Sequence, residues 1–216
     1  MQRSSVVLAA ALTVSSLVGE AKPSPMPMRP DPLEPCRIGK TWPAIQACLN
    51  THGSGTTLAE LDDARIVAFF TRTGQPDARH FEGTYLFAKR GDHWALVSTV
   101  GMDDHTSIER FEHVTVAGHD AYHARERLER TLPASTPDGV PLIGQLVMRS
   151  ELYCAAAASY CARVTSACDY IVDGNARWSY RGEVAIAGNA LTISGDRSHT
   201  NPLCNTATVD RVELGW

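Results

Sequence analysis

The sequence lacks the surplus of basic residues that nucleic-acid binding requires. Its 216 residues hold 20 Lys and Arg against 24 Asp and Glu, so the formal net charge is -4 and the pI lies near 6.0. A chain that neutralises phosphates carries excess positive charge, which excludes nucleic acid as the expected partner. No run of like charges forms a membrane-docking patch either.

Beyond its first residues the chain lacks any apolar stretch long enough to cross a bilayer, which takes about 20 residues. One uncharged run, Ser4 to Val18, follows Arg3 and is rich in Val, Leu and Ala. Gly19 and Ala21 are small residues at the positions that define a cleavage site. We therefore predict a secretory signal peptide over residues 1–21 rather than a membrane anchor. No Cys follows closely, so no lipid anchor is expected.

The sequence also has no Cys-x-x-Cys pair, which argues against a structural zinc site. All of its cysteines follow the predicted signal: Cys36, Cys48, Cys154, Cys161, Cys168 and Cys204. An even number in an exported chain predicts disulfides, because the compartment is oxidising. Local geometry favours the pairs Cys36–Cys48, Cys154–Cys161 and Cys168–Cys204. The main alternative joins Cys161 to Cys168 and Cys154 to Cys204.

Familiar catalytic motifs are missing as well. No Gly-x-Ser-x-Gly elbow is present to expose a nucleophilic serine. Gly39-Lys40-Thr41 matches only the end of a phosphate-binding loop, since Glu34 stands where that loop needs its first Gly. We therefore predict no catalytic residue and no cofactor.

Side chains of the kinds that bind metals concentrate between residues 103 and 123. They are His105, His113, His119, His123, Asp103, Asp104 and Asp120. Imidazole and carboxylate groups bind zinc or copper, but no three of these residues have a convincing ligand spacing. We therefore predict no metal site. The segment from His105 to His123 remains the basis for an alternative, metal-dependent function.

The organisation of the chain follows from its prolines and its apolar periods. Residues 22–35 hold six prolines in fourteen positions, which predicts an extended linker. Residues 36–216 then form a single domain. A short helix is expected from Thr41 to Asn50, with Thr41 as its cap and Gly53 after its end.

After this helix the apolar period becomes two, which indicates strands. They are expected at 65–71, 81–89, 93–100, 108–117, 120–131, 142–154, 160–172, 177–187, 190–194 and 206–214. The segment 120–131 also fits a helix, and we favour a strand. Trp94 and Trp178 alternate with aliphatic residues and are expected in the core. Nine or ten short strands predict a mainly β, antiparallel sandwich or barrel.

The sequence thus predicts a secreted or periplasmic, disulfide-bonded, β-rich domain whose ligand and partners it does not identify. Two functions compete. The first is a non-catalytic module that binds a protein or glycan surface, and the second is a small hydrolase, metal-dependent through the cluster from His105 to His123. A concave pocket with convergent Asp, Glu and His would favour the hydrolase, and shallow surfaces over a filled core would favour the module.

Overall fold

The computed structural model describes residues 31, 33–72, 79–101, 103–135, 141–156, 161–172, 175–195 and 211–214. The predicted signal peptide and most of the predicted linker lie outside these residues. The compact unit that contains all the described elements begins at Asp31. Leu33 is already buried, and a 3-10 turn, η1, spans Glu34–Cys36. The packed part of the chain therefore starts before the predicted boundary at Cys36.

The predicted helix is present as α1, Trp42–His52. The Thr41 hydroxyl accepts a hydrogen bond from the backbone N–H of Ala44, so Thr41 is the N-cap. Pro43 fits the first turn of α1, because a backbone nitrogen at that position has no hydrogen-bond partner within the helix. Ile45 and Leu49 are buried on one face of the helix.

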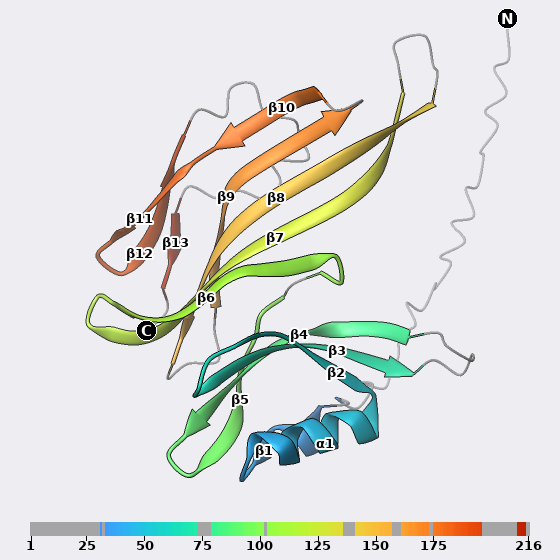
Figure 1. The fold of residues 1–216 in the computed structure, drawn as a ribbon. Helices are drawn as coiled ribbons and strands as arrows, with labels where there is room; N and C mark the ends of the chain where they lie inside the picture. The colour runs from blue at the N-terminus through green and yellow to red at the C-terminus, as the bar shows by residue number, and fades with distance from the viewer. Residues whose placement is uncertain are drawn as a thin grey trace, which may run out of the picture. The chain divides into compact units, whose positions relative to one another are not determined.

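Sheet A follows the order β1-β5-β4-β3-β2 (Figure 1). Its strands are β1 (Ile38–Gly39), β2 (Ser54–Glu60), β3 (Ala64–Arg72), β4 (Arg79–Arg90) and β5 (His93–Thr99). The predicted hairpin of β4 and β5 is confirmed, with its turn at Gly91 and Asp92. β1 and β2 were not anticipated, since both are short or polar.

Sheet B follows the order β10-β9-β8-β7-β6. Its strands are β6 (Thr106–Val116), β7 (His119–Ser135), β8 (Pro141–Ala155), β9 (Cys161–Val172) and β10 (Asn175–Arg181). The ambiguous segment after Gly118 is a strand, because β7 pairs along its length with β8.

Sheet C contains β11 (Glu183–Ala187), β12 (Ala190–Ser194) and β13 (Arg211–Glu213). The single strand expected at 177–187 is divided at Gly182, where a Cβ would lie 2.1 Å from the Tyr180 hydroxyl. Trp178, expected in the core, is 39% exposed on the edge strand β10. The described strands thus form three open antiparallel sheets, and the predicted sandwich is confirmed over the barrel.

The layers are held by separate apolar clusters. α1 covers one face of sheet A, where Leu49, Phe69 and Phe87 are fully buried. The other face of sheet A packs against sheet B through Ile66, Leu86 and Leu152. Sheet C packs on sheet B in a third cluster, which includes Val164 and Leu191.

Two predicted disulfides are present among the described residues. Cys36 is bonded to Cys48, and Cys154 is bonded to Cys161 at facing positions of β8 and β9. Cys168 is also disulfide-bonded, and its predicted partner, Cys204, lies outside the described residues. No helix within the described ranges is long and apolar enough to cross a membrane.

Candidate functional site

The aspartates and histidines between residues 103 and 123 do not meet as one cluster. Asp103, Asp104 and His105 lie together at the turn before β6. The Asp103 carboxylate already forms an ion pair with Arg130 and accepts a hydrogen bond from the backbone N–H of His105. It therefore shapes a turn. His113 and His119 are exposed.

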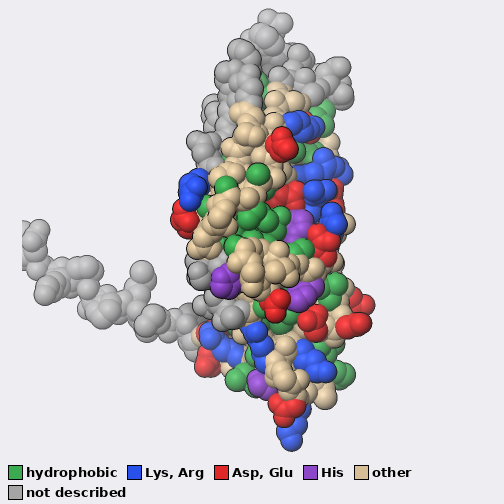
Figure 2. Space-filling model, turned by 90° about the vertical axis from the view of Figure 1, so that its left-hand side faces the viewer, with side chains coloured by type: hydrophobic (Ala, Val, Ile, Leu, Met, Phe, Trp, Pro, Cys, Tyr) green, Lys and Arg blue, Asp and Glu red, His purple; other side chains and the backbone are tan. Residues whose placement is uncertain are grey.

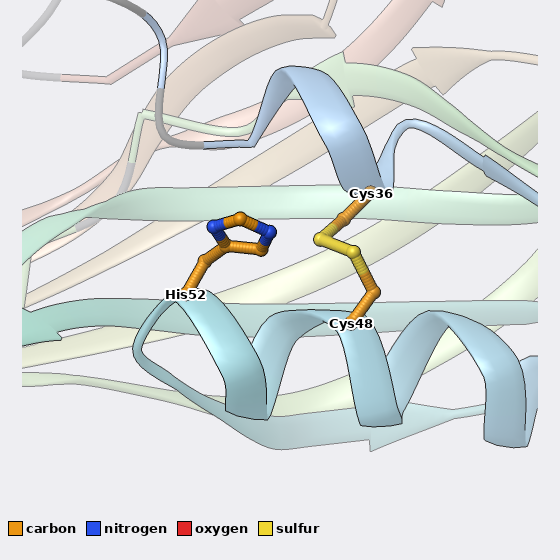
Figure 3. A group of neighbouring side chains, drawn as sticks. All are labelled: Cys36, Cys48 and His52. Atoms are coloured by element: carbon orange, nitrogen blue, oxygen red, sulfur yellow. A yellow bond between two sulfur atoms is a disulfide. The ribbon is translucent and has the colours of Figure 1, made fainter.

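A second group with metal-ligand atoms close together is formed by Cys36, Cys48 and His52. Figure 3 shows the two sulfur atoms bonded to each other beside the His52 ring. A metal-binding cysteine needs a free thiolate, so this group is a disulfide next to an exposed histidine.

His123 is the one histidine of the predicted cluster that is buried. It lies on β7, and its two ring nitrogens face two carboxylates on the flanking strands. Nδ1 lies 2.8 Å from Glu112 Oε1 on β6, and Nε2 lies 2.7 Å from Glu151 Oε2 on β8. The ring also stacks on Tyr153, with centroids 4.6 Å apart.

Both hydrogen bonds stabilise a protonated imidazole. Burial disfavours the charged form of His123, but the bonds to Glu151 and Glu112 outweigh it and raise the pKa of His123. Burial likewise opposes the charged form of Glu151, while His123 and Arg125 lower its pKa below the usual range. The hydrogen bond from His123 lowers the pKa of Glu112 as well. The protonated His123 ring therefore lies between two ionised carboxylates, and we call these three side chains the His123 ionic cluster.

A pocket of about 290 Å³ opens beside the His123 ionic cluster. We call it the sheet B pocket; its lining residues are His123, Arg125, Arg149, Glu151, Tyr153, Ser166, Gly182 and Val184. β7, β8 and β9 supply its floor, and β11 with Gly182 supplies one wall. Ser166 is the extra residue of a β-bulge, since Arg149 faces Ala167 and Ser150 faces Thr165. Bulges commonly redirect side chains beside functional sites.

Arginine and glutamate side chains surround the pocket on the same face of sheet B. Arg125 Nε donates to Glu151 Oε1 at 2.8 Å, and Arg149 Nε donates to both oxygens of Glu109 at 3.1 Å. Arg110 pairs with Glu112 at 2.7 Å. Figure 2 shows basic and acidic side chains interspersed along one edge of the molecule rather than separated by sign.

The arrangement suits binding better than proton transfer. A general base needs an available lone pair within hydrogen-bond reach of the substrate. Both nitrogens of His123 and both oxygens of Glu151 are occupied by neighbours. Ser166 lies 3.4 Å from Glu151 rather than against the imidazole, so the geometry of a nucleophilic triad is not formed.

The sequence indicated His123 as a member of a candidate cluster but did not indicate its partners. The two-residue turn at Ala117 and Gly118 sets Glu112 opposite His123, so this contact was accessible from the sequence. Glu151 and Tyr153 required the register of β7 with β8, whose connection lies outside the described residues. Ser166 depended on a bulge that no sequence pattern indicated.

The fold and site thus define a disulfide-bonded antiparallel β-sandwich with a polar pocket on one sheet. Comparisons of the chain with protein-family models, curated proteins and solved structures found no match.

Proposed function

We propose that this chain is an exported, non-catalytic module that binds a glycan through the sheet B pocket. The proposal rests on one observation: both ring nitrogens of His123 are hydrogen-bonded, one to Glu112 and the other to Glu151. His123, the one imidazole among the described lining residues, is thereby held as a buried cation, with its side chain 8% exposed. His123 therefore links β6, β7 and β8 through its side chain, and the pocket beside it remains open to a ligand.

Export is supported by the apolar N-terminal run and by the disulfides. The bonds Cys36–Cys48 and Cys154–Cys161 persist in an oxidising compartment and are rare in a reducing cytosol. A secreted or periplasmic destination accounts for both features.

The shape of the pocket favours a glycan over a protein partner. Its volume is at the lower end for small-molecule sites, which suits one sugar residue. Protein interfaces instead bury at least about 1,000 Å² around clustered apolar anchors. The described large apolar side chains that are exposed lie on four different strands: Ile38, Ile143, Trp178 and Ile186.

The competing function, a small hydrolase, is favoured by one observation. His123 and Glu151 converge on a concave pocket, as they would in an active site. The side chains of both are more than nine-tenths buried and bonded to each other, which leaves neither available to a substrate. We therefore prefer binding.

An array of neutral and acidic glycans, probed with the purified exported protein, tests the proposal. We expect retention of at least one glycan class and recovery of the eluted glycan with unchanged mass. Ser166→Tyr should abolish retention by filling the pocket, whereas Ser107→Tyr, on an exposed position of β6, should not. Absence of any retained glycan would refute the function, and a hydrolysed product would establish the hydrolase instead.

A further inference from the structure

One arginine of the sheet B pocket faces another arginine on the neighbouring strand. Arg149 lies directly opposite Arg127 in the register of β7 and β8. Like charges at facing positions destabilise a sheet. Glu109 compensates, because it accepts two hydrogen bonds from Arg149 Nε and lies 3.7 Å from Arg127 Nη1. Arg125 lies on the same face and donates from Nε to Glu151.

Both pocket arginines thus use only the Nε of their guanidinium groups. Within the part of the chain that the structure describes, the Nη1 and Nη2 atoms of Arg125 and Arg149 form no hydrogen bond. Their side chains are 42% and 35% exposed. Terminal guanidinium nitrogens bind carboxylate, sulfate and phosphate oxygens strongly, because they offer parallel donors.

The charge of the lining also favours an anion. Arg125, Arg149 and the His123 imidazolium line the pocket, and Glu151 is the one carboxylate among the described residues of the lining. Glu109 and Glu112 approach from the rim, where Arg110 and Arg127 pair with them. The described groups therefore leave positive charge at the pocket itself.

We propose that the glycan carries an anionic substituent, a carboxylate or a sulfate, which binds the terminal nitrogens of Arg125 and Arg149. This inference rests on the proposed function and specifies its ligand. The rest of the lining suits a sugar ring: the Ser166 oxygen can accept a hydrogen bond from a sugar hydroxyl group, and Tyr153 offers an aromatic surface. An acidic peptide would use the arginines but would leave the Ser166 oxygen and the Tyr153 ring without the partners that a sugar supplies.

Isothermal titration of the full exported protein tests the inference. The probes are three oligosaccharides of equal length, one containing uronate, one sulfated and one neutral, together with an acidic peptide. We expect one acidic oligosaccharide to bind at least about tenfold more tightly than the neutral one. Its affinity should fall as salt is raised. Which acidic probe binds better distinguishes carboxylate from sulfate recognition.

Variants locate the anion. Arg149→Gln should weaken binding of the acidic oligosaccharide about tenfold, and Arg149→Lys should recover only part of it, because lysine lacks the planar fork. Arg211→Gln is the matched control. Arg211 is exposed and also donates from Nε to a carboxylate, that of Glu213, but it lies outside the pocket lining. Thermal unfolding of each variant confirms that it is folded.

The outcomes separate the two proposals. Equal binding of the neutral and acidic oligosaccharides, with Arg149→Gln unchanged, would overturn the anionic ligand and leave glycan binding intact. Binding of the acidic peptide without binding of any oligosaccharide would overturn both.

Discussion

At the residue scale, the most distinctive feature of the described residues is the His123 ionic cluster, in which an imidazolium is buried between two carboxylates. Taking charged groups out of water is costly, and the cost is offset only when geometry and hydrogen bonds are complete. Here His123 is matched on both nitrogens, and Glu151 also accepts from Arg125 and Ser166. Loss of one member leaves its partners buried without compensation.

His123→Gln should therefore destabilise the protein by about 3 kcal/mol at pH 6. The pKa of His123 is raised in the folded state. Its stabilising contribution is complete below the ordinary histidine value of about 6.5 and is lost as the pH rises through the raised value. The difference between wild type and variant should consequently be smaller at pH 9 than at pH 6.

Urea unfolding of both proteins at the two pH values measures this difference. His113→Gln is the control, since His113 is exposed on the neighbouring strand β6, and it should change stability by less than about 0.5 kcal/mol. An equal loss for His123→Gln at pH 6 and pH 9 would contradict a role for the imidazolium.

At the element scale, the sequence predicted elements better than it predicted the positions where their periodicity breaks. α1, β3 and the hairpins around Gly91 and Gly118 followed from caps, period and turn residues. Strict alternation along the strand predicted at 93–100 would place Trp94, Leu96 and Val100 on one face. A bulge at Val97 instead carries Val100 to the opposite cluster, because one extra residue reverses the alternation.

The assembly of strands into sheets was also inaccessible to local patterns. One continuous strand was expected over residues 177–187, but β10 and β11 belong to different sheets. Trp178 consequently lies on an edge rather than in the core. The alternation along such a segment reports which residues are apolar and not which sheet they join. The lining of the sheet B pocket was the hardest part to predict, because its residues come from four strands that the sequence alone does not bring together.

The turn between β6 and β7 offers a test of local strain. Ala117 is exposed and adopts φ 51°, while Gly118 follows at φ 83°. This left-handed conformation costs a residue with a Cβ roughly 1 kcal/mol, and asparagine tolerates it better. Ala117→Asn creates the Asn-Gly pair that two-residue hairpins prefer.

We expect Ala117→Asn to stabilise the protein by about 0.5 kcal/mol and Ala117→Val to destabilise it by about 1 kcal/mol or more. Chemical denaturation of the two variants beside wild type gives both values. A stabilising valine would show that the turn does not hold this conformation in solution.

At the scale of the whole molecule, sheets A and B share one apolar cluster and a few polar contacts. The Tyr122 hydroxyl on β7 donates to Asp63 before β3 at 3.2 Å. Burial, together with the Asp63 charge, raises the pKa of Tyr122 to about 12. Cys161 on β9 lies 3.2 Å from the Ser98 hydroxyl on β5. Because these contacts cross the same interface as the apolar cluster, the two sheets should unfold together.

Leu152→Ala tests this coupling, since Leu152 is fully buried in the cluster that both sheets share. Removing a buried leucine costs about 2 to 5 kcal/mol, which corresponds to a fall in Tm of roughly 5 to 15 °C for a domain of this size. Tryptophan fluorescence of a background that carries both Trp178→Phe and Trp216→Phe follows Trp42 and Trp94 alone, which pack at sheet A, whereas far-UV circular dichroism follows all the strands. The two signals should change at one temperature in wild type and at one lower temperature in Leu152→Ala. If fluorescence kept its original midpoint while the dichroism transition moved down, sheet A would be an independent folding unit and the shared cluster would not couple the sheets.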